Sequence, residues 1–145
     1  MHTKLDENLG FIIHDVARLF RWSFDLQSQD LGLTRAQWSV LAHLYRRDGI
    51  QQNSLAKLLE IKPISLTRQL DRLEADSWIE RRNDPSDRRA KNIYLTPKAK
   101  PMLDKLSTLG HQVQEKALVG VNAKDRETLK SALKKIRKNL TNFDQ

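Results

Sequence analysis

IERRNDPSDRRAKNIYLT, residues 79–96, places five cationic side chains around a short run of turn-forming residues. Strand-forming residues flank that run, Trp78-Ile79 before it and Ile93-Tyr94-Leu95 after it. Asp84-Pro85 suits the first two positions of a type I turn, because proline presets the backbone angle needed at the second position. The stretch therefore predicts a β-hairpin with arginine at its tip.

Two short helices are predicted directly before this hairpin. The first fits Ser54–Glu60, and Pro63 disfavours helical geometry at Lys62, so the chain turns there. The second spans about Ile64–Asp76 and has two faces. Its apolar stripe is Leu66, Leu70 and Leu73, and its polar stripe is Ser65, Arg68, Gln69 and Arg72. Two short helices around a tight turn, with a polar and basic outer face on the second, form a helix-turn-helix pattern.

A basic hairpin that follows a helix-turn-helix is interpreted as a wing. An arginine on a narrow projection can enter a minor groove, where its planar guanidinium responds to groove width. The alternative is a solvated basic loop in a basic protein, and the preceding two-faced helix favours the wing. Asp87 beside Arg88 would repel phosphate, so we expect this carboxylate to orient an arginine or to tie the loop.

The overall charge favours an anionic partner. The chain has 145 residues, 39% of them hydrophobic, and a formal net charge of +8. Residues 31–100 carry 14 basic and 8 acidic side chains, which is most of the excess. Such a balance indicates nucleic acid before membrane. The length and the hydrophobic content suit one compact domain.

Several function classes are excluded or disfavoured. The chain has no cysteine, which excludes disulfides and cysteine-rich zinc sites. Its four histidines are scattered and no glycine-rich phosphate loop is present, so we expect no enzyme activity, no metal and no cofactor. No apolar run approaches the roughly 20 residues that span a bilayer, and no signal-peptide pattern opens the chain. We therefore expect a soluble, cytoplasmic protein.

Longer helices are predicted on both sides of the basic region. An apolar helical period covers residues 6–29, Thr34 and Gln37 form a capping box, and Thr96-Pro97 suits the start of another helix. The last helix has an apolar stripe that either covers a second chain or packs within the monomer. This stripe consists of Leu129, Leu133, Ile136, Leu140 and Phe143. We expect one domain over 1–145, with a winged helix-turn-helix lobe at about 34–96 and terminal helices at about 5–30 and 97–143.

Three segments carry a family resemblance. They are LGLTRAQWSVL (31–41), SLAKLLEIKPISLTRQLDRLEADSWIERR (54–82) and DPSDRRAKNIYLTPKA (84–99). Together they resemble the MarR family of winged-helix transcription regulators, and more narrowly its SlyA-like branch. The resemblance implies a mainly α fold with a small β-hairpin wing, and a homodimer that binds near-palindromic double-stranded DNA. It places Ser65, Thr67 and Arg68 on a recognition helix, and Asp87, Arg88 and Arg89 in the wing signature.

One departure from the family pattern concerns the start of the recognition helix. Relatives often have proline directly before the serine, whereas here Ile64 has that place and Pro63 comes one residue earlier. The first residue of the helix decides which side chain first meets a base. The family pattern therefore leaves the start of this helix open.

The recognition helix is predicted to enter the major groove. Arg68 and Arg72 could pair with guanine and Gln69 with adenine, while Ser65 and Thr67 near the helix start suit phosphate. Arg72 could instead pair with Asp76 one turn later. The full set of expected DNA-binding residues is Ser65, Thr67, Arg68, Gln69, Arg72, Arg82, Asp87, Arg88, Arg89 and Lys91.

The resemblance also implies that the lobe at about 34–96 binds DNA, that the terminal helices at about 5–30 and 97–143 are dimerisation helices, and that an effector binds. The expected dimerisation residues are Leu9, Ile12, Leu129, Leu133, Ile136, Leu140 and Phe143. A small phenolic or aromatic carboxylate ligand is expected to bind His14, Arg18 and Trp38. The alternative is that Trp38 belongs to the core, that His14 is a surface histidine or one with its hydrogen bonds satisfied, and that Arg18 pairs elsewhere on the surface.

Two functions are therefore weighed. The favoured function is a sequence-specific DNA-binding transcription regulator that acts as a homodimer. The alternative is a nonspecific architectural protein that bends or coats DNA.

Overall fold

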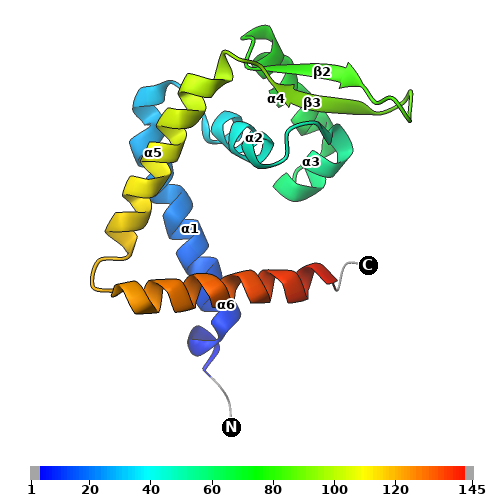
Figure 1. The fold of residues 1–145 in the computed structure, drawn as a ribbon. Helices are drawn as coiled ribbons and strands as arrows, with labels where there is room; N and C mark the ends of the chain where they lie inside the picture. Colours follow the sequence, from blue (N-terminus) through cyan, green and yellow to red (C-terminus); the bar gives the residue numbers. More distant parts are fainter. Residues whose placement is uncertain (1–3, 143–145) are drawn as a thin grey trace.

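The computed structural model describes residues 4–142, which form six α-helices, two short 3-10 helices and one three-stranded sheet (Figure 1). The α-helices are α1 (Leu9–Ser28), α2 (Arg35–Arg46), α3 (Gln52–Leu59), α4 (Pro63–Ala75), α5 (Ala99–Ala117) and α6 (Ala123–Thr141). The strands are β1 (Ile50–Gln51), β2 (Ile79–Asn83) and β3 (Lys91–Leu95), and the 3-10 helices are η1 (Leu5–Glu7) and η2 (Gln29–Leu31). The predicted fold class, a mainly α winged helix-turn-helix with terminal helices, is confirmed.

Helix starts follow from local sequence. The capping box at α2 is present, since Gln37 N donates to Thr34 Oγ1 at 3.2 Å and Thr34 N donates to Gln37 Oε1 at 3.0 Å. Lys62 has extended geometry, and Pro63 is the first residue of α4. The recognition helix therefore begins one residue before the predicted Ile64, because proline is well tolerated at the first helical position.

The predicted helix start at Thr96-Pro97 is wrong, and α5 begins at Ala99. The Thr96 hydroxyl donates to the carbonyl oxygen of Ser77 at the end of the α4–β2 connection, so it does not cap a helix. The backbone carbonyl of Thr96 instead accepts from Ala99 N at 3.0 Å. Thr96 therefore fastens the hairpin to the connection that follows α4.

The sheet has the order β1-β3-β2, and both pairings are antiparallel. The hairpin pairs Ile79 with Leu95 and Asn83 with Lys91, so its strands extend further toward the tip than the sequence indicated. Strand β1, which the sequence analysis did not predict, pairs Ile50 with Ile93 on the other edge of β3. The wing is thereby attached to the chain segment between α2 and α3.

Burial is concentrated in residues 34–96, which we call the winged lobe. Its fully buried apolar side chains come from α2, α3, α4 and the strands: Val40, Leu41, Leu44, Leu55, Leu66, Leu70, Leu73, Ile79 and Ile93. Helix α1 contributes one buried residue, Ser28, and α6 contributes none. Figure 1 shows the winged lobe at one end of the molecule, α1 and α5 side by side, and α6 away from the lobe.

The part of the chain that the structure describes has neither a membrane-spanning helix nor a metal-binding cluster. None of its helices is both long enough and apolar enough to cross a membrane. Within the same residues, 4–142, no group of three histidine or acidic side chains is arranged to hold a metal ion.

Candidate nucleic-acid interface

The outer face of α4 is polar and accessible. Ser65, Arg68 and Arg72 are exposed and Gln69 is half-buried, while the leucines of the opposite stripe are fully buried. The ion pairs found among residues 4–142 do not include one between Arg72 and Asp76. Arg68 and Arg72 therefore project from the surface as cations that a nucleic acid could approach.

Thr67 lies near the start of α4, where the sequence places it, and its hydroxyl makes two hydrogen bonds within the protein. Its hydroxyl donates to the carbonyl oxygen of Pro63 at 3.0 Å and accepts from Gln52 Nε2 at 2.9 Å. The residue therefore links the start of α3 to the first turn of α4. Its hydroxyl is already used within the protein, which leaves Ser65 as the free hydroxyl at this end of the helix.

Arg81 connects the recognition helix to the wing. Its backbone N–H and its Nη2 donate to the two carboxylate oxygens of Glu74, at 2.9 and 2.8 Å, and Nη2 lies 2.7 Å from Asp71 Oδ1. Glu74 and Asp71 belong to α4, whereas Arg81 lies in β2. These contacts fix the angle between the helix and the hairpin, and no pattern in the sequence predicted them.

Glu74 and Arg81 shift each other's pKa. The hydrogen bond from the Arg81 side chain lowers the pKa of Glu74, and the same bond raises the pKa of Arg81. Both groups therefore stay ionised over a wide pH range. Arg81 is consequently a structural cation whose charge is balanced by two carboxylates, rather than one of the cations offered to a ligand.

The wing loop is organised by two aspartates. Asp84 accepts from Ser86 N at 2.8 Å, from Ser86 Oγ at 2.7 Å and from Gln51 Nε2 at 3.0 Å, and the bonds from Ser86 lower the pKa of Asp84. Asp87 accepts from Arg89 N at 2.9 Å, which is the loop-tying role expected for it. Both carboxylates thus hold the backbone of the wing loop in place.

The cations of the hairpin fall into two groups. Arg82 pairs with Glu80 at 2.6 Å, and its guanidinium lies 4.3 Å from the centre of the Tyr94 ring, so its charge is engaged within the sheet. Arg88 and Arg89 are exposed, and within residues 4–142 neither takes part in an ion pair. The Lys91 ammonium donates to the amide oxygen of Asn83, and the ion pairs found among residues 4–142 do not include Lys91. The tip therefore presents three cations without a carboxylate partner.

A polar hollow of about 200 Å³ lies between this tip and the start of α3. Its lining residues are Gln51, Gln52, Asn53, Arg89, Ala90 and Lys91. The amide-rich start of α3 was not predicted as part of the interface. The signal that could have indicated it is the run Gln51-Gln52-Asn53 between two predicted helices, since amide side chains bind both phosphate oxygens and bases.

The three residues predicted for an effector are not assembled into one site within the chain. His14 and Arg18 are exposed on α1. Trp38 is half-buried, its indole N–H donates to Asp25 Oδ1 at 2.9 Å, and its ring centre lies 4.4 Å from that of Phe24. Trp38 therefore belongs to the packing between α1 and α2, as the alternative interpretation expected.

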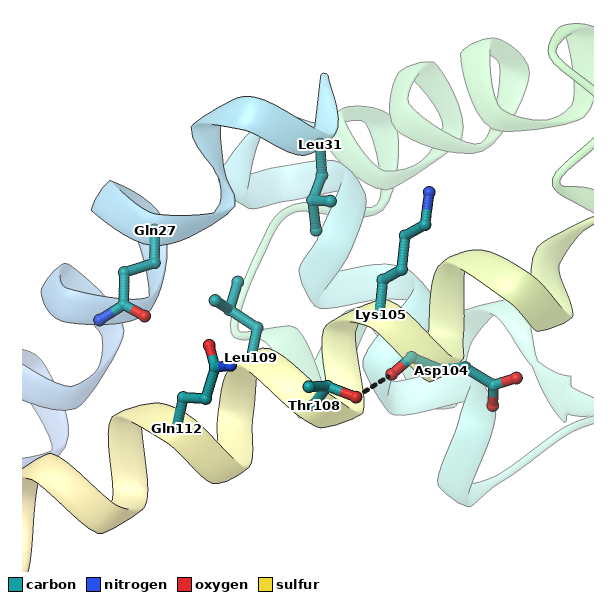
Figure 2. A pocket seen from close by; sticks show the side chains of 7 residues that line it. All are labelled: Gln27, Leu31, Asp104, Lys105, Thr108, Leu109 and Gln112. Atoms are coloured by element: carbon teal, nitrogen blue, oxygen red, sulfur yellow. Dashed lines mark hydrogen bonds between the residues drawn. The ribbon is translucent and has the colours of Figure 1, made fainter.

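A hollow does exist elsewhere, between the end of α1 and the middle of α5 (Figure 2). It measures about 310 Å³ and is lined by Gln27, Leu31, Asp104, Lys105, Thr108, Leu109 and Gln112. Figure 2 shows the Thr108 hydroxyl turned back to the Asp104 carbonyl oxygen, at 3.0 Å. None of the three predicted effector residues lines this space.

The predicted dimerisation residues lie on α1 and α6 with much of their apolar surface uncovered. Leu133, for example, is 42% exposed in the single chain and Leu140 is 62% exposed. Ile136 is half-buried, and Leu9, Ile12 and Leu129 are exposed. Phe143 lies outside the described residues.

Comparisons with known proteins agree on one family. A model of the MarR family matches residues 33–91. The transcriptional regulator PA3341 is 33% identical, with 93% of this chain and 99% of that chain covered and a TM-score of 0.79. MarR from E. coli in its apo form is 29% identical, with 89% and 96% covered and a TM-score of 0.77. A mutant of E. coli MarR complexed with operator DNA is 28% identical, with 92% and 99% covered and a TM-score of 0.72.

Proposed function

The chain belongs to the MarR family of transcription regulators, and from that premise we propose that it binds operator DNA as a homodimer. A mutant of E. coli MarR that is 28% identical has been crystallised with operator DNA, and the surface described above suits the same kind of partner. One observation carries the proposal: α4 and the wing tip both expose cations, and Arg81 holds the two at a fixed angle. Assignment to the SlyA-like branch stays a prediction.

Helix α4 is the element that would read bases. Arg68 and Arg72 can each form paired hydrogen bonds to guanine, and Gln69 can do so to adenine. Ser65 lies in the first turn of α4, where the helix dipole and free backbone N–H groups favour a phosphate. Thr67 would act indirectly, by holding α4 against α3 through Gln52.

The wing would contact the DNA backbone and a minor groove. Arg88, Arg89 and Lys91 supply positive charge on a loop that Asp84 and Asp87 hold in one conformation. A loop that is already ordered loses less conformational entropy on binding than a mobile one. Arg82 would contribute less than these three, because Glu80 and Tyr94 already engage its guanidinium.

A second copy of the chain would cover the uncovered apolar surface. Helix α1 exposes eight large apolar side chains along one face and its flanks: Leu9, Phe11, Ile12, Ile13, Val16, Leu19, Trp22 and Leu26. Helix α6 adds Leu129, Leu133 and Leu140. Rows of large exposed apolar side chains along a helix mark an interface. Two copies related by a twofold axis would present two α4 helices to two half-sites of a near-palindrome.

Selection of bound sequences from a random DNA pool tests this function. We expect the wild-type protein to enrich a near-palindrome. Arg68→Ala should lose about 1–3 kcal/mol of binding free energy and relax one position of each half-site. Arg88→Ala should weaken all sequences alike and reduce the salt dependence by about one ion per half-site. Lys135→Ala, which removes an exposed cation of α6, is the matched control and should change neither property.

The same selection separates the two functions weighed from the sequence. An enriched palindrome supports a sequence-specific regulator. Recovery of a pool with no preferred sequence, together with strong salt-dependent binding, would support the nonspecific architectural protein instead. Undiminished affinity of Arg88→Ala would remove the wing from the interface in either case.

The effector, a small phenolic or aromatic carboxylate, stays a prediction. Arg18 is the residue that best suits a carboxylate, and it is exposed on α1, where a second chain could complete a site. Calorimetric titration with a salicylate-type acid, with and without bound DNA, tests it. Release of DNA by the acid in the wild type but not in Arg18→Ala would support the prediction, and absence of competition would contradict it.

A further inference from the structure

One carboxylate joins the end of α1 to the beginning of α2. Asp25 Oδ1 accepts the indole N–H of Trp38 at 2.9 Å, and Oδ2 pairs with the guanidinium of Arg35. Arg35 is the first residue of α2 and Trp38 the fourth, so both partners lie in one helical turn. The Asp25 side chain is 22% exposed and that of Arg35 is 55% exposed. The contact with Trp38 is therefore the one that is partly shielded from water, which strengthens it relative to a surface contact.

The surroundings make this joint stiff. Thr34 and Gln37 cap α2 at the same turn, so the backbone that carries Arg35 and Trp38 is fixed. Phe24 packs on the Trp38 ring, with ring centres 4.4 Å apart and ring planes inclined by 54°. Phe24 also lies beside Gly110 of α5, where an added Cβ would be 3.8 Å from the Phe24 ring, an ordinary van der Waals distance. Helices α1, α2 and α5 therefore converge at Asp25 and its neighbours.

The joint separates two parts with different partners. Helix α1 carries most of the uncovered apolar surface assigned above to the second chain, whereas α2 belongs to the buried core that also holds α4. The orientation of α2 on α1 therefore fixes where α4 lies relative to the dimer. The 12 residues of α2 span about 18 Å, so a rotation of about 10° at the joint moves its far end by about 3 Å. That displacement is close to one base-pair step of DNA, about 3.4 Å.

We propose that Asp25 is a positioning residue that sets the distance between the two DNA half-sites which the dimer accepts. It touches no DNA itself and acts through Arg35 and Trp38. The inference rests on the proposed function, because a spacing exists only if two chains bind two half-sites. It differs from a purely stabilising role, which would change affinity equally for every spacing.

Operators with the selected half-sites and with one base pair added to or removed from the centre test this. We expect the wild-type protein to bind both altered operators much more weakly than the original. The penalty is the ratio of the dissociation constant for an altered operator to that for the original one. In Asp25→Ala this ratio should be roughly fivefold smaller, because one partly buried charge-assisted contact that holds α2 on α1 is lost. The base preference within each half-site and the salt dependence should stay as in the wild type.

Further variants keep the test valid if Asp25→Ala folds poorly. Asp25→Asn retains an oxygen for Trp38 but loses the charge that pairs with Arg35, and Trp38→Phe retains the ring but loses the N–H donor. Both should give intermediate penalties. Asp30→Asn makes the same charge change at an exposed position five residues later and should match the wild type. Thermal unfolding of each variant shows that it is folded.

The outcomes are distinguishable. Weaker binding of Asp25→Ala to all three operators by one common factor, or penalties equal to those of the wild type, would overturn the role of Asp25 and leave the proposed function intact. A wild-type protein that binds all spacings equally would instead contradict the homodimer on paired half-sites, and the inference with it.

Discussion

The winged lobe and the terminal helices α1 and α6 use apolar residues in opposite ways. In the lobe, leucines at helical spacing are fully buried against one another, as Leu41, Leu66 and Leu70 show. In α1 and α6 the same kind of spacing leaves the side chains uncovered, and Leu133 is 42% exposed. The periodic pattern of apolar residues is therefore the same in both regions, but only the lobe buries these residues within one chain.

This difference indicates that the two regions have different functions. A region that buries its own apolar residues keeps its shape without a partner, which suits a surface that must match the grooves of DNA. A region that leaves them uncovered needs a partner to remove them from water. The joint at Asp25 lies where these two regions meet.

The largest expected effect lies in the core of the lobe. Leu70→Ala should lower the free energy of unfolding by about 2–5 kcal/mol, because it leaves a cavity among fully buried neighbours. Urea denaturation followed by circular dichroism measures this loss. A cost below about 1 kcal/mol would show that the lobe is not packed as described.

The corresponding change in α6 should act on association instead. Leu133→Ala removes a partly exposed side chain, so we expect little effect on the fold of one chain. A symmetric interface contains the residue twice, and the dimer should lose about 2 kcal/mol, or about 30-fold in dissociation constant. Sedimentation at several concentrations measures it. An unchanged dissociation constant would place α6 outside the interface.

Two glycines, one in the winged lobe and one before α6, extend the comparison to single residues. Gly49 and Gly120 both have left-handed backbone geometry, with φ of +84° and +85°. A Cβ on Gly49 would lie 2.9 Å from the Tyr94 ring, whereas a Cβ on Gly120 would meet nothing within 4 Å. Gly49→Ala should cost about 2 kcal/mol or more, and Gly120→Ala about 1 kcal/mol from backbone strain alone. Equal thermal shifts would contradict the close packing of the wing against Gly49.

The smallest effect concerns the link between helix and wing. Because Arg81 lowers the pKa of Glu74, the folded state gains stability above the ordinary glutamate pKa of 4.5 and loses it as the pH falls further. Glu74 is partly exposed, so Glu74→Gln should cost no more than about 1 kcal/mol near neutral pH.

The pH dependence gives this prediction its control. Glu74→Gln should flatten the decline in stability below pH 4.5 that the wild-type protein shows. Thermal unfolding of both proteins between pH 3 and 7 measures this, with the range chosen to bracket that pKa. An identical acid slope for Glu74→Gln and the wild type would show that the link contributes nothing to the folded state.

The parts of the fold that depend on local rules could be predicted from the sequence. The capping box at Thr34, the leucine stripe of α4 and the hairpin are each set by residues close together in the chain. Strand β1 could not be predicted, since two residues form it only because β3 comes alongside. The Thr96 hydroxyl was misassigned for a similar reason, because a carbonyl 19 residues earlier competes for it.

The candidate site shows the same limit. The accessible cations Arg68 and Arg88 were found from their positions on a polar stripe and at a turn. Charge alone does not show which cations already have partners within the protein. The sequence therefore predicts Arg82 as a DNA-binding residue, although its guanidinium pairs with Glu80 and lies over the Tyr94 ring. Asp25, which bonds to two residues of α2, has no distinguishing feature in the sequence.

The claim on which the account depends most is that two chains share the apolar surface of α1 and α6. Sedimentation equilibrium of the wild-type protein, over micromolar concentrations and without DNA, tests it most directly. We expect a mass of about twice the 16.9 kDa of one chain. A single species of 16.9 kDa across that range would contradict the account.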